Sequence, residues 1–335
     1  MKQPKFLKSG DTVGICAPSF GAAENPYRLR LESAVKHFQN RGYHVVLSPS
    51  AKKNNGLASA DAKTRAAEFT DLYLSCDAVF SAGGGEVMME ILPYLDFARL
   101  KAASPKFFVG YSDNTVLTYT LATLCDTIAL YDYCAPTFGM TEWDKSLTDA
   151  FAFLTGEKTE FAGYPLYETE SVRGDEETAL NGFSLTEPSR WKHTHNLSVR
   201  GRILGGCLDV LRLLPGTPYD KTREFTETYR KDGILWTLEN CELAPLDVIR
   251  TLWQLKQAGW FRNAKAFLFG RSLQRAEQFD LDFVRAAEYA LQEFDVPKIF
   301  DADFGHLPPS LPIATGSLAD VCVCDGKGTL RYLWD

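Results

Sequence analysis

The sequence lacks the features of several protein classes. No apolar run among its 335 residues reaches the roughly 18 residues that span a bilayer. Basic residues do not predominate, with 36 Lys and Arg against 43 Asp and Glu, which argues against a nucleic-acid-binding face. The first residues lack the apolar segment of a secretory signal. We therefore expect a cytoplasmic protein that binds neither membranes nor nucleic acids.

Cysteine is present, but without the spacing of a metal site. The eight cysteines include no Cys-x-x-Cys pair and lie mostly in apolar segments, so we expect reduced, mostly buried thiols. One metal site is conceivable at Asp301, Asp303 and His306, which would make the protein a metallohydrolase. Their spacing matches no strong zinc pattern, so we predict no bound metal.

The first half of the chain alternates strand and helix patterns. Short apolar runs predict strands, and apolar residues at helical spacing predict the helices between them. The predicted strands cover residues 12–17, 44–47, 77–82, 107–111 and 127–131. Such alternation is typical of an α/β domain with a parallel sheet and helices on both faces.

Regular patterning weakens from about residue 133 to residue 199 and then returns. The later patterns are strands at 202–206, 234–238, 266–269, 319–324 and 329–334, with helices at about 245–258 and 280–294. The last two strands are joined by a hairpin signal. Because so long an irregular loop is unusual inside one domain, we predict three parts. These are an N-terminal domain (1–160), an irregular crossing segment (161–199) and a mixed α/β C-terminal domain (200–335).

A candidate nucleophile follows the fourth predicted strand. Residues 110–114 read GYSDN and precede a predicted helix, so Ser112 lies on a tight strand-to-helix turn. A serine there is exposed, and the helix N-terminus behind it can stabilise negative charge. The pentapeptide departs from Gly-x-Ser-x-Gly at Asn114, and Ser112 or Asp113 could instead be a helix N-cap.

Three other segments contain candidate residues. The glycine loop of residues 83–85 could form an oxyanion hole, bind phosphate or be a plain tight turn. Met88 replaces the third glycine of the dinucleotide fingerprint. Glu239 ends a predicted strand and could orient a histidine, although a solvated carboxylate is the simpler interpretation. His306, in a loop rich in glycine and proline, is the best general-base candidate among the five histidines.

These segments together resemble the LD-carboxypeptidases, a family of serine peptidases that includes muramoyltetrapeptide carboxypeptidases and microcin C self-immunity peptidases. Six segments match in the same order over nearly the whole chain. They are residues 7–19, 84–96, 110–113, 205–218, 238–239 and 304–306. The resemblance implies an N-terminal flavodoxin-like or Rossmann-like parallel-sheet domain and a smaller C-terminal mixed α/β domain.

The resemblance also implies a catalytic site. It implies a triad of Ser112, His306 and Glu239, with an oxyanion hole formed by the backbone N–H groups of Gly85 and Asp113. The expected substrate is a short cell-wall peptide whose last bond joins an L-centre to a D-amino acid. No cofactor is expected, and many members are homodimers.

The residues expected to contact substrate are less well defined. Gly84 and Glu86 lie in the loop that faces substrate in the family, and the residues that follow the glycines here differ from the common pattern. Trp191 could stack on a nucleobase if the substrate were a peptide–nucleotide amide, as for a self-immunity peptidase, or it could be a packed loop aromatic. A non-catalytic nucleotide- or metabolite-binding module that uses residues 83–85 is an alternative of another class.

Overall fold

The chain folds into two compact units. The computed structural model describes residues 1–170, 174–193 and 195–334, so positions 171–173 and 194 of the predicted crossing segment lie outside the described residues. The first unit comprises Met1–Lys158 with Glu170–Ser184, and the second comprises Thr159–Thr169 with Leu185–Asp335. Residues 161–199 thus contribute to both units. Among the described residues, none of the helices has the length and apolarity needed to cross a bilayer.

The first unit contains five parallel strands. They are β1 (Thr12–Cys16), β2 (His44–Leu47), β3 (Ala78–Ser81), β4 (Phe107–Val109) and β5 (Ala129–Tyr131). Their spatial order is β2-β1-β3-β4-β5, which is the flavodoxin-like order. All residues of β3, β4 and β5 are buried, because helices cover both faces of such a sheet. The predicted parallel-sheet domain is confirmed.

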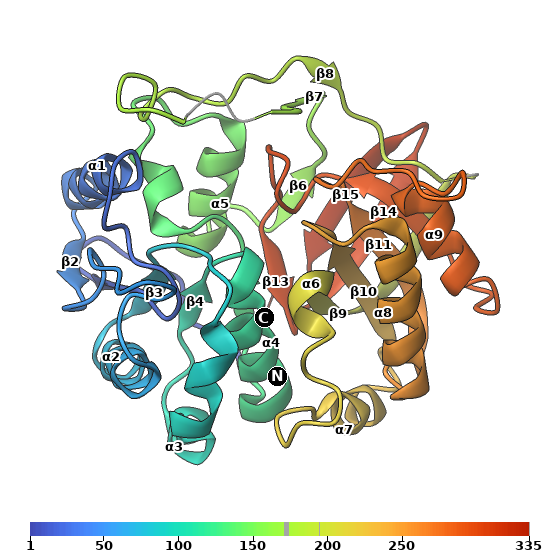
Figure 1. The fold of residues 1–335 in the computed structure, drawn as a ribbon, viewed down its shortest axis with the longest axis horizontal. Helices are drawn as coiled ribbons and strands as arrows, with labels where there is room; N and C mark the ends of the chain where they lie inside the picture. Colours follow the sequence, from blue (N-terminus) through green and yellow to red (C-terminus); the bar gives the residue numbers. More distant parts are fainter. Residues whose placement is uncertain (171–173, 194, 335) are drawn as a thin grey trace. The chain divides into compact units, whose positions relative to one another are not determined.

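Helices and 3₁₀ turns connect these strands or follow the last of them (Figure 1). They are α1 (Tyr27–Asn40), α2 (Ala62–Ser75), α3 (Phe97–Ala102), α4 (Thr115–Cys125) and α5 (Lys145–Thr155), with the turns η1 (Met88–Tyr94), η2 (Ser112–Asn114) and η3 (Ala135–Gly139). Three helices begin at an aspartate whose side chain accepts a backbone N–H of the first turn, namely Asp61, Asp96 and Asp144. Helix α4 is buried on nearly every side, which fixes the turn η2 before it.

The second unit contains a seven-stranded mixed sheet (Figure 1). Four parallel strands, in the order β12-β11-β10-β9, are β9 (Leu197–Cys207), β10 (Ile234–Glu239), β11 (Ala264–Gly270) and β12 (Lys298–Ala302). The antiparallel β14 (Leu318–Cys324), β15 (Lys327–Tyr332) and β6 (Glu160–Ala162) continue the sheet beyond β9. Asp325 and Gly326 join β14 to β15 with positive φ at both positions, as a tight hairpin requires.

The other elements of this unit are short or cover the sheet. The helices are α6 (Leu208–Leu211), α7 (Thr222–Thr228), α8 (Pro245–Gln257) and α9 (Phe283–Ala290). The remaining strands are β7 (Leu166–Tyr167), β8 (Glu187–Pro188) and β13 (Ile313–Thr315). Helix and strand alternation after residue 200 confirms the predicted mixed α/β fold.

Candidate active site

Ser112 lies in a strained turn of the first unit. The turn η2 follows β4 directly, and Ser112 has φ +64°, a left-handed conformation that serine seldom adopts. The Tyr131 hydroxyl accepts the Ser112 backbone N–H at 3.1 Å, which holds the turn in place. The N-cap of α4 is Asn114, without a side-chain cap bond, so the helix-cap interpretation of Ser112 and Asp113 is wrong. A strained strand-to-helix turn is typical of an exposed nucleophile.

The glycine loop after β3 lies against this serine. A Cβ added to Gly84 would lie 3.1 Å from the Ser112 Cβ, so the backbone of the loop passes close to the candidate nucleophile. Gly85 has φ +139°, and a Cβ there would lie 2.2 Å from the Ser19 hydroxyl, so only glycine fits. Glu86, the next residue, is exposed.

Asp113 connects the turn that contains Ser112 to the glycine loop and its surroundings. Its buried carboxylate accepts the Ser19 hydroxyl at 2.6 Å and the Met88 N–H at 2.9 Å. Burial raises the pKa of Asp113, and these donors partly oppose that shift. Asn114 adds a second link, since its side-chain amide donates to the Gly83 and Tyr111 carbonyls at 2.9 and 2.8 Å. The position that departs from the Gly-x-Ser-x-Gly pattern therefore joins the glycine loop to the serine turn.

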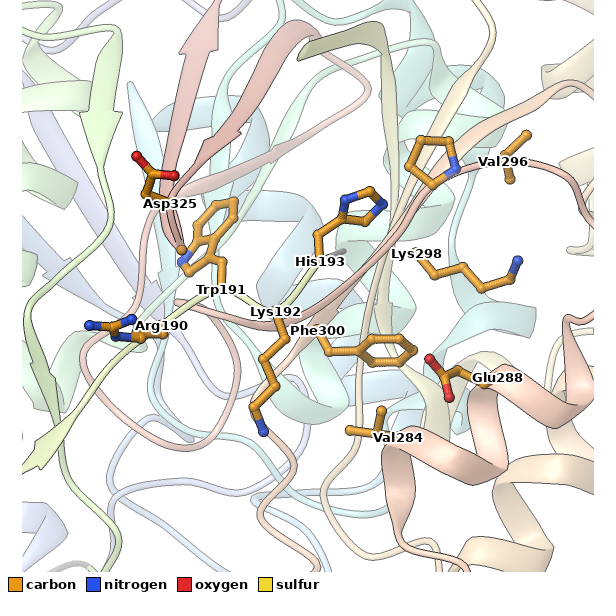
Figure 2. Close-up of a pocket in the computed structure, with 12 residues that line it drawn as sticks. Arg190, Trp191, Lys192, His193, Val284, Glu288, Val296, Lys298, Phe300 and Asp325 are labelled. Atoms are coloured by element: carbon orange, nitrogen blue, oxygen red, sulfur yellow. The ribbon is translucent and has the colours of Figure 1, made fainter. Parts of the chain in front are cut away.

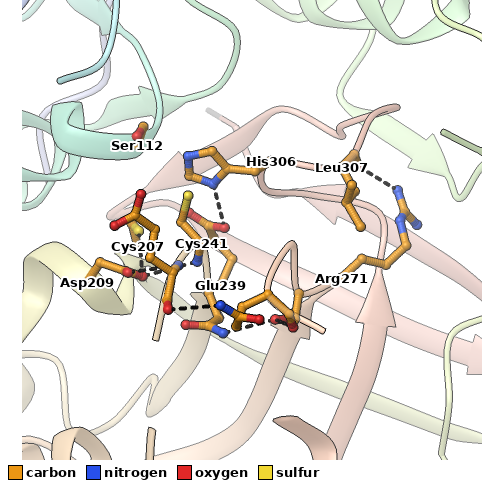
Figure 3. A network of polar contacts seen from close by, with 12 residues as sticks. Ser112, Cys207, Asp209, Glu239, Cys241, Arg271, His306 and Leu307 are labelled. Carbon is orange, nitrogen blue, oxygen red and sulfur yellow. Dashed lines mark hydrogen bonds and ion pairs between the residues drawn. The ribbon is translucent and has the colours of Figure 1, made fainter. Parts of the chain in front are cut away.

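In the second unit, Glu239 and His306 form a hydrogen-bonded pair (Figure 3). Glu239 ends β10, and His306 follows β12, so both side chains lie at the carboxyl ends of parallel strands. The His306 Nδ1 and a Glu239 carboxylate oxygen are 2.9 Å apart, and Glu239 is fully buried. A carboxylate at Nδ1 holds the ring proton there and leaves Nε2 as the proton acceptor.

The electrostatics of this pair favour a charged imidazole. Burial by itself lowers the pKa of His306, but the charge and hydrogen bond of Glu239 hold that pKa well above its ordinary value. The neighbouring Cys241 thiol raises the pKa of His306 further. The neutral imidazole of this pair is therefore a stronger base than an ordinary histidine.

The backbone before His306 can approach Glu239 only because residue 305 is glycine. Gly305 has φ +106°, and a Cβ at this position would lie 2.9 Å from a Glu239 carboxylate oxygen. A side chain there would be strained and would push the acid away from the imidazole.

Sequence reasoning missed Arg271, which fixes the loop on the other side of His306. This buried arginine, just after β11, donates to the carbonyl of Leu307 at 3.1 Å (Figure 3). It also donates to the carbonyl of Pro309 at 2.9 Å. It also forms a buried ion pair with Asp303. The sequence does not show whether an arginine that follows an apolar strand is exposed to solvent or buried beneath a loop.

The metal hypothesis built on Asp301, Asp303 and His306 is wrong. The Asp303 carboxylate already accepts hydrogen bonds from several donors, and Asp301 pairs with Lys192 at 2.7 Å. The three residues do not form a cluster within the described part of the chain. His306 gathers instead with Glu239 and Cys207.

Trp191 is a packed residue of the second unit. It is only 3% exposed, and its indole N–H donates to the Asp303 carboxylate at 2.7 Å. It borders a groove of about 650 Å³ together with Lys192, Lys298 and Phe300 (Figure 2). The burial of the ring fits the alternative of a packed loop aromatic, and stacking on a nucleobase stays a prediction.

Two family models match the chain. The LD-carboxypeptidase N-terminal domain matches residues 13–132, and the LD-carboxypeptidase C-terminal domain matches residues 200–321. These ranges include Ser112 and the glycine loop in the first case, and Glu239 and His306 in the second.

Curated relatives align over almost the full length. The "Probable murein peptide carboxypeptidase" of Bacillus subtilis is 26% identical and covers 95% of this chain and 90% of its own. The microcin C7 self-immunity protein MccF of Escherichia coli is also 26% identical, over 92% of this chain and 90% of its own.

Solved structures share the fold. An MccF-like protein from Bacillus anthracis has a TM-score of 0.83 at 22% identity and covers 100% of both chains. Muramoyltetrapeptide carboxypeptidase from Oxalobacter formigenes has a TM-score of 0.71 at 22% identity, over 95% of this chain and 98% of its own. MccF has also been solved in complex with aspartyl sulfamoyl adenosine, with a TM-score of 0.82 at 22% identity over 99% and 98% of the two chains.

Proposed function

Because the chain belongs to the LD-carboxypeptidase family, we propose that it is a serine carboxypeptidase. It hydrolyses the terminal L–D bond of a short peptide derived from the cell wall, in muropeptide recycling. The observation that carries the proposal is the buried Glu239–His306 hydrogen bond, which is the acid–base half of a triad. The family relationship argues against a non-catalytic binding module.

In the proposed mechanism, Ser112 is the nucleophile. His306 Nε2 accepts the hydroxyl proton as Ser112 Oγ attacks the scissile carbonyl, and Glu239 stabilises the resulting imidazolium. The backbone N–H groups of Gly85 and Asp113 donate to the oxyanion. The intermediate then expels the D-amino acid, whose amine takes the proton from His306. Water hydrolyses the acyl ester with His306 again as the base, so no metal or cofactor takes part.

Two features of the first unit support these roles. Ser112 occupies a left-handed turn between β4 and α4, and the loop of Gly84 and Gly85 lies against it. Hydrogen bonds through Asp113 hold the two together, so donors and nucleophile are preorganised. The exposed Glu86 next to this loop is our candidate for contact with substrate.

The test is hydrolysis of a cell-wall tetrapeptide by the Ser112→Ala variant. We expect kcat to fall by about 10⁴-fold or more, because an activated nucleophile is lost. The matched control is Ser75→Ala, at a serine in α2 of the same unit, which should retain wild-type activity. An S112A rate within tenfold of wild type, in a folded protein, would overturn the assignment.

A second candidate is a self-immunity peptidase that cleaves a peptide–nucleotide or aminoacyl-nucleotide amide. Its support is the similarity to MccF over 92% of this chain. Comparing kcat/KM for the tetrapeptide with that for an aminoacyl sulfamoyl adenosine separates the two functions. A preference of tenfold or more for either compound decides between them.

The proposal also covers the cellular location, the oligomeric state and the domain boundaries. We place it in the cytoplasm as a homodimer, with domain boundaries at residues 1–160, 161–199 and 200–335. Size-exclusion chromatography with light scattering tests the dimer. Fractionation of cells tests the location.

A further inference from the structure

Two thiols lie beside the Glu239–His306 pair, and the mechanism uses neither. Cys207 ends β9 and is in register with Glu239 on the neighbouring parallel strand β10. Its Sγ, a Glu239 carboxylate oxygen and a His306 ring nitrogen all lie within 4.8 Å of one another. Cys241 follows Glu239 by two residues, and its side chain points toward the imidazole (Figure 3). Sulfur, nitrogen and oxygen atoms of these residues thus lie close together at the carboxyl ends of the parallel strands.

A single carboxylate, Asp209, holds both thiol-bearing segments in place (Figure 3). One of its oxygens accepts the Cys207 thiol at 3.3 Å and the Cys241 backbone N–H at 3.1 Å. The other oxygen accepts the Glu242 N–H at 2.9 Å. Hydrogen bonds within the second unit therefore already hold both thiol-bearing segments. Ion binding would not have to order a flexible loop.

The donor set matches a particular class of metal ion. Thiolate, imidazole and carboxylate are the ligands that Zn²⁺ binds tetrahedrally, at about 2.0–2.3 Å. Ligand atoms at those distances lie roughly 3.3–3.8 Å apart. The ligand atoms of Cys207, Glu239 and His306, which lie within 4.8 Å of one another, would therefore have to move closer together by about 1 Å. Hard ions such as Mg²⁺ prefer oxygen ligands and would bind weakly to this donor set.

We propose that Cys207, Cys241, Glu239 and His306 form an inhibitory binding site for Zn²⁺ and similarly soft divalent cations. Binding displaces the two thiol protons and one proton of the charged His306 imidazole, all of which pass to solvent, and places the ion among four protein ligands. A site with four protein ligands keeps no open position for catalysis. The ion also occupies the imidazole and carboxylate that the triad needs. This inhibitory consequence rests on the proposed function, whereas ion binding does not.

The binding arm uses the purified full-length protein with reduced thiols and Co²⁺ or Zn²⁺ alone as the probe. We expect one ion per chain and, with Co²⁺, thiolate-to-metal charge-transfer absorption. Cys207→Ser and Cys241→Ser should each weaken binding at least tenfold and reduce this band. Cys207→Ala provides a second substitution at the fully buried position, and thermal melts identify folded variants.

The matched control removes the two cysteines of β14, in the double variant Cys322→Ser, Cys324→Ser. It should bind Co²⁺ like the wild type. Unchanged binding in the Cys207 and Cys241 variants, or loss of binding in the β14 control, would overturn the proposed site.

The activity arm measures peptide hydrolysis with and without Zn²⁺. We expect inhibition that a chelator reverses and that is at least tenfold less sensitive in the Cys241→Ser variant. Undiminished hydrolysis with the site loaded would overturn the inhibitory role. If no peptide is hydrolysed at all, the proposed function fails while the cobalt spectrum still decides the metal site.

Discussion

Replacing Glu239 with glutamine removes one charge from the acid–base pair and little else. The amide has nearly the volume of the carboxylate, so the buried end of β10 keeps its packing. The lost charge is the one that raises the pKa of His306 above its ordinary value. Burial, which lowers that pKa, then becomes the dominant influence on the imidazole.

Two effects follow from the 2.9 Å contact between Glu239 and Nδ1. Glutamine can present its NH₂ group to the ring and favour the wrong tautomer, a change that costs about 10⁴-fold in kcat in the serine-protease triad. That loss corresponds to about 5.4 kcal/mol of transition-state stabilisation. In addition, the pKa of His306 falls. The wild type should therefore lose activity on acidification at a pH above the ordinary histidine pKa of about 6.5, and E239Q at a pH below it.

Stability should follow the same titration. A histidine whose pKa is raised by folding stabilises the native state fully below the unfolded pKa of about 6.5. This contribution is lost as the pH rises through the higher folded value. The wild-type free energy of unfolding should therefore decline from about pH 6.5 upward, and E239Q should lack that decline.

The assay is release of the terminal D-amino acid from a cell-wall tetrapeptide between about pH 5 and pH 10, with urea unfolding at the same pH values. An E239Q enzyme within tenfold of the wild-type rate, with the same acidic limb, would refute the role assigned to Glu239.

Three further predictions concern neighbouring residues and metal removal. Gly305→Ala should destabilise the protein by about 1–3 kcal/mol and lower kcat, because its Cβ would strain the backbone and crowd Glu239; an unchanged melting temperature contradicts this. Asp113→Asn should lower kcat more than it alters KM and cost roughly 1–3 kcal/mol, since the buried acceptor of the Ser19 and Met88 donors is weakened; wild-type kcat contradicts it. Prolonged dialysis against a chelator should leave hydrolysis intact, and a loss restored by added metal would show that a metal is required.

Much of the first unit could be predicted from local pattern. The runs that form β1 to β5 are short and apolar, and the interval between β4 and α4 places Ser112 on a turn. The identity of Asn114 looked like a mismatch because its bonds to Gly83 and Tyr111 exist only once the loops are folded together. The spacing of residues along the sequence cannot predict such a contact.

The parts that escaped prediction depend on register and on distant contacts. Cys207 faces Glu239 because β9 and β10 pair in one register, and a shift of one residue would turn it to the other face of the sheet. The metal hypothesis failed for a similar reason, since Asp303 is occupied by Trp191 and other donors from remote segments. Residues 159–169 belong to the second unit and residues 170–184 to the first. No periodic pattern in the sequence predicts this division.

The Arg271–Asp303 pair has a consequence for how this enzyme can be handled. The charges are buried, so dissolved ions screen them far less than they screen a pair at the surface. Since the same guanidinium holds the backbone just after His306, the alignment of the imidazole should withstand high ionic strength. A search for salt-tolerant variants can therefore leave this arginine and aspartate untouched and alter the surface charges instead.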